Sequence, residues 1–495
     1  MHKSSAMGIV ANQSIRNTVI TYVGFAIGAA NALFMYTHFL GKTYYGVTAF
    51  LLSAANIMMP LMAFGAHNTL VRFYTGYKDS RRQAEFLTFM LLIPLVLCLP
   101  VAATGYLFYH QIAGALSHRN PILYDYIWLI PIVGLCMGYF EIFYAWVKVH
   151  MQSVYGNFVK EVLLRILISA FLFAVYLKWI TAEQFVYWLV GIYLAATLAM
   201  VAFAFKVRRP SWKFTVPSDA RPVLVYSLFV ILAGSVANLL LDLDKTMLGA
   251  MMDIENVAYY SVAIFIATVI AVPSRAMHQI AYPVTAKLMS DGQHDDLNDF
   301  YKKTSITLQV AGGYVLLGIL VNIKSVYELL PVEYSAGIWV VFVIGISKFL
   351  DLLLGNNNAI LFNSKYYRAV LFLGLMLAAL AVALNLILIP LYGIEGSAVA
   401  TLVAITCYSA AKLLFVVKKM KLYPFTRATL RGLVLQVLIF AAFYFWDFPF
   451  GALVSIVLKS MLLTAVYAVA VYQMKLSPDV NRALDAFLGT ARFKR

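Results

Sequence analysis

Long apolar runs separated by short polar segments repeat along the chain from Thr18 to Tyr472. Many of these runs reach the length of about 20 residues that a helix needs to cross a bilayer. They do not alternate in the shorter segments that the strands of a membrane barrel would show. The pattern therefore predicts an all-α polytopic membrane protein with about fourteen transmembrane helices. We place the spans at residues 17–39, 44–66, 85–108, 125–147, 158–178, 183–205, 223–243, 256–278, 304–323, 336–354, 367–389, 394–416, 429–446 and 451–473.

The segment Ala383–Thr401 shows how neighbouring spans are joined. A first helix is expected to end near Ile389, because Pro390 lacks an N–H and disfavours helical geometry in the residue before it. Tyr392-Gly393 predicts a tight turn, and a second apolar helix follows it. The small residues Gly396-Ser397-Ala398 at its start predict close packing against another helix. The segment is therefore expected to be a helical hairpin between two spans.

Composition and charge support a membrane protein and indicate its orientation. The chain is 62% hydrophobic and 12% charged, whereas a soluble protein is about 25% charged. Its net charge of +16 would suggest nucleic acid in a soluble protein. Here, 32 of the 38 Lys and Arg residues fall at one set of alternate span ends and loops, so we expect no nucleic-acid partner. The same alternation predicts that both termini are cytoplasmic.

The polar segments divide the chain into two similar halves. Longer polar segments follow the second and the eighth span, and a basic linker with Pro210 and Pro217 lies between the sixth and the seventh. The expected organisation is an N-lobe at residues 1–209, a cytoplasmic linker at 210–222, a C-lobe at 223–420, and a final helix pair with a cytoplasmic tail at 421–495. Two pseudo-symmetric six-helix lobes around a midline cavity are typical of transporters.

Several classes of chemistry lack support in the sequence. No loop is long enough for an appended catalytic domain, and no Gly-rich phosphate loop, HExxH motif or Ser-His-Asp arrangement stands out. The three cysteines Cys98, Cys136 and Cys407 lie inside apolar spans without metal-type spacing. We expect a transporter that is not an enzyme and has neither a metal site nor a cofactor.

Charged side chains within the spans are candidate functional residues, because each costs at least about 2.5–3.5 kcal/mol to insert. Asn238, Asp242 and Lys245 share one face of the seventh span by their spacing. They fit either the polar wall of a substrate or ion cavity, or an ion pair at the outer edge. Glu141 lies in the middle of the fourth span, and could bind a proton or cation or pair with an Arg of another helix.

Three arginines near the inner ends of spans are candidate anion ligands. Arg275 follows Pro273, and it could clamp a phosphate through two parallel hydrogen bonds or reach the lipid headgroups instead. Arg16 has the same two interpretations, and Arg72 lies on a polar line that continues from the first two spans. Asn31 and Asn56 could face a cavity from those two spans.

Two further charge pairs have the spacing of ion pairs within one helix. Glu161 and Arg165 are separated by four residues, and Lys348 and Asp351 by three. A structural ion pair near the inner surface is favoured over an ion-coupling site for both.

Three segments resemble the polysaccharide (O-antigen, Wzx-type) flippase family of the multidrug/oligosaccharidyl-lipid/polysaccharide exporter superfamily. Leu384–Ala398 looks like the family's "LN-apolar-IP-x-YG-x-x-GAA" hairpin, and Asp244–Gly249 is similar to its "D-x-x-x-LG" segment. Ala258 stands where the family usually has Gly in the "G-x-Y-x-x-A" segment that follows. The segment Phe64–Phe73 also resembles the corresponding segment of the family in its position and in its residue types.

The resemblance implies a fold in which spans 1, 2, 7 and 8 line a central cavity. It also implies a substrate, an oligosaccharide on a polyprenyl diphosphate, that crosses the cell inner membrane by alternating access, as in lipopolysaccharide biosynthesis. By position, Arg16, Arg275 and Arg72 would hold the diphosphate. Membrane lipids are implied partners, and a polysaccharide polymerase or glycosyltransferases are partners that the resemblance leaves open.

Two alternatives remain open at the level of sequence. A multidrug or peptidoglycan-precursor exporter of the same superfamily is one, and an exporter of organic cations should carry acidic groups without cationic partners. Asp242 and Glu141 keep that alternative open. A membrane glycosyltransferase or polymerase is the other, but it would need a large outside loop with catalytic residues, and the outside loops here are short.

Overall fold

The computed structural model describes residues 2–211, 215–217, 220–233 and 236–492, and within these ranges every regular element is a helix. This confirms the predicted all-α membrane fold. Ten helical runs in the described residues are long and apolar enough to cross a membrane. Two of them, Arg16–Met62 and Arg368–Met420, each cover two predicted spans. The number of fourteen spans stays a prediction.

The chain forms two compact units, residues 1–261 and 262–495, which we call the first and the second unit. The predicted lobe boundary at 210–222 stays a prediction. In the structure α10 and α11, which the sequence assigned to the C-lobe, pack against α3 and α2 of the first unit. The helices of the first unit are α1 His2–Ala29, η1 Ala30–Leu40, α2 Gly41–Met62, α3 Ala66–Phe73, η2 Tyr74–Gly76, α4 Ser80–Leu107, α5 Tyr109–Ser117, η3 Pro121–Asp125, α6 Leu129–Val149, α7 Ser153–Phe158, η4 Val159–Leu163, α8 Leu164–Tyr176, α9 Ala182–Val207, α10 Ala220–Ala233, α11 Val236–Met251 and α12 Glu255–Thr268, the last of which continues into the second unit.

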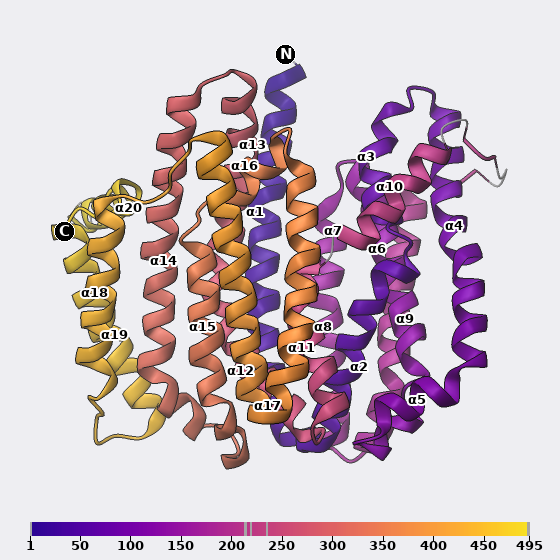
Figure 1. Cartoon of the computed structure of the whole chain (residues 1–495), viewed down its shortest axis with the longest axis horizontal. Coiled ribbons are helices and arrows are strands. Elements are labelled where there is room, and N and C mark those ends of the chain that lie inside the picture. Colours follow the sequence, from indigo (N-terminus) through magenta and orange to yellow (C-terminus); the bar gives the residue numbers. More distant parts are fainter. Residues whose placement is uncertain (1, 212–214, 218–219, 234–235, 493–495) are drawn as a thin grey trace. The chain divides into compact units, whose positions relative to one another are not determined.

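The core of the first unit forms where α6 packs against α2 and α9 (Figure 1). Trp146 and Phe86 are completely buried there, together with Met200 from α9. Two segments of π-helix, η1 and η4, lie against α8 and α1 respectively. Short π-helical segments occur often at functional sites.

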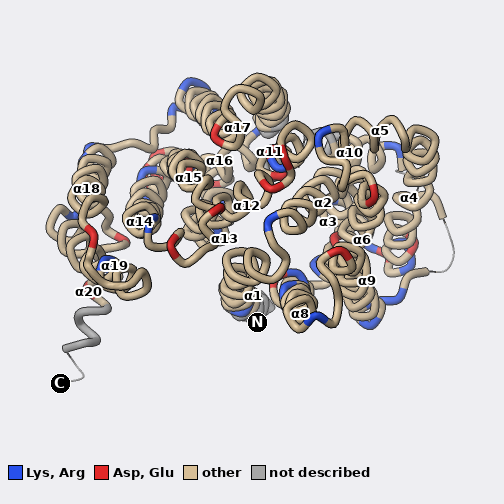
Figure 2. Tube along the Cα trace, turned by 90° about the horizontal axis from the view of Figure 1, so that it is seen from below, with Lys and Arg blue, Asp and Glu red and all other residues tan. Residues whose placement is uncertain are grey.

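The second unit contains η5 Val269–Ala271, α13 Val272–Ser290, α14 His294–Glu328, η6 Val332–Gly337, α15 Ile338–Leu352, α16 Asn357–Asn363, α17 Tyr367–Met420, α18 Arg427–Tyr444, α19 Ala452–Gln473 and α20 Pro478–Arg492. The long helix α14 packs against α15, α18 and α19, which run beside it in Figure 1. Leu317, Leu463 and Tyr467 form a buried contact among α14 and α19. Uncharged residues make up most of the described part of each labelled helix in Figure 2.

The predicted hairpin lies within α17. The backbone leaves helical geometry at Gly393, where φ is +60° and ψ is −134°, so the predicted turn is confirmed. The first helix, however, includes Pro390, although we expected it to end near Ile389. A Cβ at Gly396 would collide with the carbonyl of Leu388. The small residues therefore allow the second helix to pack closely against the end of the first, as predicted.

Candidate functional site

A polar cavity of about 370 Å³ lies inside the first unit. Four helical segments enclose it, namely α2, α6, α9 and the continuous run from η4 into α8. Its walls combine charged, neutral polar and apolar side chains. These are Asn56, Met59, Met137, Phe140, Glu141, Val159, Lys160, Glu161, Leu164, Arg165, Ile168, Tyr193, Ala196 and Thr197. We refer to this space as the polar cavity.

An ion pair between two helices forms one wall of the polar cavity. The Lys160 ammonium of η4 lies 2.5 Å from the Glu141 carboxylate of α6. The Glu141 side chain is 15% exposed and that of Lys160 is 46% exposed. Lys148 is a further basic residue near Glu141. Its ammonium lies over the Tyr144 ring, 3.7 Å from the ring centre. Glu141 therefore has a cationic partner on another helix, although this partner is a Lys and not the expected Arg.

A second ion pair links the helical run from η4 into α8 to α1. Arg165 binds Glu161 at 3.0 Å, which confirms the pair predicted from their spacing. The Arg165 guanidinium also donates to the Gly24 carbonyl of α1. Gly24 and Gly28 lack side chains where η4 and Arg165 cross, and a Cβ at either position would collide with Glu161 or Arg165. The absence of two side chains thus lets a charged residue lie across the neighbouring helix.

Neutral polar groups complete the cavity. Asn56 of α2 and Tyr193 of α9 both line it. Thr197 donates its hydroxyl to the carbonyls of Cys136 and Tyr193. Asn31 is buried behind the cavity wall, where its amide donates to the Arg165 carbonyl and accepts from Ser169. The structure thus brings Asn56 and Glu141 to one cavity and places Asn31 in the packing between η1 and α8.

The residues predicted on the seventh span lie on α11. Lys245 and Asp242 form an ion pair at 3.2 Å, and both side chains are mostly buried. Asp242 lies close enough to Tyr193 of the cavity for its charge to act on the tyrosine hydroxyl. Asp244 is fully buried and accepts a hydrogen bond from Tyr260 at 2.8 Å. The side chain of Asn238 is outside the described part of the chain.

The three arginines predicted to bind an anion are exposed. Arg16 and Arg72 belong to the first unit, and Arg275 begins the exposed face of α13 in the second. Within the described residues, none of the three forms an ion pair with a carboxylate. The Arg72 guanidinium lies over the Tyr226 ring, 4.7 Å from its centre. Each guanidinium therefore keeps hydrogen-bond donors that could bind an anion.

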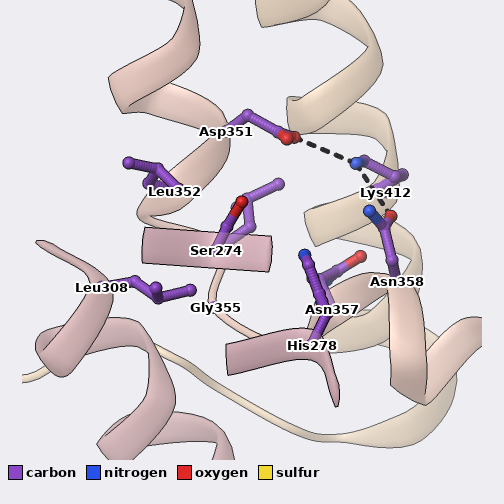
Figure 3. A pocket seen from close by; sticks show the side chains of 10 residues that line it. Ser274, His278, Leu308, Asp351, Leu352, Gly355, Asn357, Asn358 and Lys412 are labelled. Atoms are coloured by element: carbon purple, nitrogen blue, oxygen red, sulfur yellow. Dashed lines mark hydrogen bonds and ion pairs between the residues drawn. The ribbon is translucent and has the colours of Figure 1, made fainter. Parts of the chain in front are cut away.

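A smaller polar cluster lies in the second unit (Figure 3). The ammonium of Lys412, from α17, binds Asp351 of α15 at 3.3 Å and Asn358 of α16 at 3.1 Å. His278 and Asn357 line the same space, and the Nδ1 and Oδ1 atoms of these side chains are buried without a hydrogen-bond partner among the described residues. The enclosed volume of about 10 Å³ is at the lower size limit for one water molecule. This cavity cannot hold a larger ligand.

Sequence reasoning did not identify several groups in these two clusters. Tyr193, Lys160 and Lys412 had not been singled out as site residues, although Lys160 and Lys412 are charges within predicted spans. Inspection of every span charge would have found the two lysines. Tyr193 gives no such signal, because the chain contains 32 tyrosines and many of them lie at span ends.

Comparison with known proteins identifies the family of this chain and solved structures that share its fold. The profile of a family described as "Polysaccharide biosynthesis protein" matches residues 14–289, more than half of the chain. Comparison with curated protein sequences gives no match. Comparison with solved structures gives matches that cover most of the chain.

Two solved transporters illustrate the shared fold. The chain matches "Lipid II flippase MurJ, inward closed conformation" with a TM-score of 0.68 and 14% identity, over 93% of this chain and 100% of that chain. It matches an inward-facing "multidrug resistance MATE family transporter of the MOP superfamily" with a TM-score of 0.56 and 15% identity, over 81% of this chain and 97% of that chain. At these identities the likeness concerns the fold.

Proposed function

The chain belongs to the polysaccharide biosynthesis protein family, and from this premise we propose that it is a flippase for lipid-linked oligosaccharide. The substrate is an oligosaccharide on a polyprenyl diphosphate, and it moves from the inner to the outer leaflet by alternating access. The likeness of the fold to MurJ, which is titled a lipid II flippase, supports transport of a lipid-linked substrate.

The distribution of charge is the observation that carries this proposal. The carboxylates of Glu141, Glu161, Asp242 and Asp351 each have a basic partner within their own unit. Arg16, Arg72 and Arg275 have no such carboxylate partner in the described residues. The protein thus offers unpaired positive charge and no unpaired negative charge among these candidate groups. An anionic ligand fits this balance.

A diphosphate is an anion that guanidinium groups bind well. Arginine can donate two parallel hydrogen bonds to phosphate oxygens, and such charge-assisted bonds are about twice as strong as neutral ones. The exposed positions of Arg16, Arg72 and Arg275 leave the guanidinium groups accessible to a substrate. We assign these three residues to diphosphate binding.

The location of the protein and its partners follow from the same proposal. The protein acts in the cytoplasmic membrane with both termini in the cytoplasm, which the distribution of Lys and Arg in the sequence supports. It acts as a transporter and not as an enzyme. A polysaccharide polymerase or glycosyltransferases would supply or use its substrate, and membrane lipids surround it.

Export of organic cations is the second candidate function, because the fold is shared with MATE transporters. A site for an organic cation needs a carboxylate that is free to bind it. Glu141 and Asp242, the two carboxylates that kept this alternative open, are both paired. The charge balance therefore favours the anionic substrate. A peptidoglycan precursor carries the same diphosphate, and its sugar–peptide head group would distinguish it.

The proposal can be tested in proteoliposomes with a fluorescent oligosaccharide on polyprenyl diphosphate. Movement between leaflets is measured by chemical quenching of the label from outside. We expect Arg275→Ala to slow flipping about tenfold, and Arg16→Ala and Arg72→Ala to slow it by smaller factors, because each removes a charge-assisted hydrogen bond. Arg82→Ala is the matched control, since Arg82 is also exposed and lies in the first turn of α4.

Two outcomes would contradict the proposal. One is flipping at the wild-type rate in all three arginine variants. The other is accumulation of an organic-cation dye such as ethidium by the wild-type protein without movement of the lipid-linked substrate, which would favour drug export.

A further inference from the structure

We propose that the polar cavity of the first unit binds a sugar residue of the lipid-linked substrate through Asn56 and Tyr193. This inference rests on the proposed function for the identity of the substrate, and it assigns the sugar to a site distinct from the three arginines. The class of ligand is a neutral, hydroxyl-rich group. The argument depends on the size, the charge balance and the free hydrogen-bonding groups of the cavity.

The polar cavity is large enough for an organic ligand. Its volume of about 370 Å³ lies within the range of about 300–1,000 Å³ that small-molecule sites occupy. Four helical segments enclose it, and its apolar lining includes Phe140, Met59 and Met137. Apolar side chains can cover the C–H faces of a sugar ring, while polar groups fix its orientation.

The charges of the cavity are already used within the protein. Lys160 binds Glu141, and Arg165 binds both Glu161 and the Gly24 carbonyl. Two acidic and two basic groups therefore cancel on the cavity wall. A diphosphate would have to displace a carboxylate from its base, and an organic cation would have to displace a base. A neutral ligand requires neither change.

Neutral hydrogen-bonding groups remain available in the same space. The Asn56 amide and the Tyr193 hydroxyl form no hydrogen bond with any described residue, and both line the cavity. An amide offers two donors and an acceptor, and a phenol offers one donor and can also accept. Thr197 uses its proton in bonds to backbone carbonyls, so its oxygen is left as an acceptor. A sugar hydroxyl both donates and accepts, and it matches this mixed set.

The position of Tyr193 makes it a good reporter of binding. It lines the cavity from α9, whereas Asn56 lines it from α2. Tyr193→Phe removes only the oxygen and keeps the ring, so it tests the hydrogen bond with little change in packing. Asn56→Leu tests the second group with a side chain of similar size.

The first experiment compares two lipids in proteoliposomes, the oligosaccharide on polyprenyl diphosphate and the same polyprenyl diphosphate without sugar. We expect Tyr193→Phe to slow the first lipid about fivefold and leave the second unchanged, because one buried hydrogen bond is lost. The Tyr193→Phe, Asn56→Leu double variant should slow the first lipid further. Tyr187→Phe is the matched control, since Tyr187 lies on the same helix and packs against Tyr126 and Trp128 outside the cavity.

The second experiment measures binding without transport. The oligosaccharide is released from its lipid, and its saturation-transfer NMR signal is recorded with protein in a detergent that has no sugar head group. We expect a signal with wild type and with Tyr187→Phe, and a loss of most of it in the double variant. Thermal unfolding of each variant checks that the fold is retained.

The outcomes separate the two proposals. Equal slowing of both lipids, or an unchanged NMR signal in the double variant, would overturn the sugar site. The absence of an NMR signal with wild type would also overturn it, because water alone would then fill the cavity. A wild-type protein that moves neither lipid but gives the expected NMR pattern would contradict the flippase and leave the sugar site supported. Movement of both lipids with no effect of either substitution would support the flippase and contradict the sugar site.

Discussion

Lys412 and Asp351 form an ion pair in which the two partners are buried to very different degrees. The Nζ of Lys412 lies 3.3 Å from Oδ1 of Asp351, and the side chains are 1% and 47% exposed respectively. The ammonium also binds Asn358 and lies over the Tyr408 ring, 4.3 Å from its centre. The cation therefore depends on its partners for stabilisation, whereas about half of the carboxylate side chain is exposed.

This asymmetry predicts unequal effects of neutralising the two partners. Asp351→Asn should destabilise the protein by about 3 kcal/mol, because it leaves a buried ammonium without a counter-charge. Lys412→Met should cost less, since it leaves a half-exposed carboxylate and replaces the lysine stem by an apolar side chain. Thermal unfolding in detergent measures both variants. Equal losses, or a larger loss for Lys412→Met, would show that the pair is not asymmetric in energy.

The close contact at the hairpin predicts a specific intolerance at Gly396. Gly396→Ala should destabilise the protein by about 1–3 kcal/mol, because the new Cβ would meet the Leu388 carbonyl. Gly451→Ala is the control, since no atom lies within 4 Å of a Cβ there. Both variants are compared with wild type by thermal unfolding. If the two substitutions had the same effect, the packing of the hairpin would not be as close as described.

The Asn120 side chain connects the segment after α5 to the end of α11 and to the residues between α11 and α12 through hydrogen bonds. Its amide donates to the carbonyls of Gly249 and Met252, each at 2.7 Å, and its Oδ1 accepts from the Ile254 N–H at 2.9 Å. The neighbouring ion pair of Arg119 and Asp253 has side chains that are 58% and 62% exposed. The buried amide should therefore dominate this attachment.

We predict that Asn120→Ala destabilises the protein by about 3 kcal/mol, because it leaves several buried backbone groups unpaired. Arg119→Ala should cost less than about 1 kcal/mol, as expected for an exposed pair. Hydrogen–deuterium exchange should rise at residues 249–255 in the first variant and remain near wild type in the second. Unchanged exchange in Asn120→Ala would contradict the assigned role of the amide.

Asp447, in the connection between α18 and α19, predicts a dependence of stability on pH. Its hydrogen bond from Lys459, at 2.6 Å, holds the pKa of the Asp447 carboxyl below its usual value. A lowered pKa in the folded state stabilises the protein above the pKa of the unfolded state, about 4, and this contribution is lost as the pH falls through the folded value. Asp447→Asn should therefore be less stable than wild type at pH 7.

The difference between wild type and Asp447→Asn should shrink as the pH is lowered below about 4. Melting temperatures recorded between about pH 3 and about pH 7 measure this difference. Glu333→Gln serves as a control, because Glu333 is exposed and forms no ion pair within the described residues. A difference that stays constant with pH would show that Asp447 contributes through packing alone.

Features that depend on neighbouring residues could be predicted from the sequence. The turn at Gly393 follows from a proline and a glycine close together in an apolar run. The pair of Glu161 and Arg165 follows from helical spacing. These interactions form within one helix or one turn, so a short segment contains the whole cause.

Features that depend on packing between distant segments could not be predicted in the same way. Asp351 forms an ion pair with Lys412 of another helix, which the spacing within its own helix could not indicate. Glu141 likewise binds Lys160 of η4. Which helix faces which is decided by the fit of whole apolar surfaces. Tyr193 became a candidate only when the walls of the polar cavity were known.

The pairing of charges within each unit has an electrical consequence. A single charge that crosses the full membrane field changes in energy by about 2.3 kcal/mol per 100 mV. Each of four carboxylates forms an ion pair that carries no net charge; these are Glu141, Glu161, Asp242 and Asp351. Movement of these ion pairs with the protein would therefore do almost no work against the membrane potential. Any voltage dependence of the transport cycle would then arise mainly from the charge of the substrate and from the three arginines that we propose to bind it.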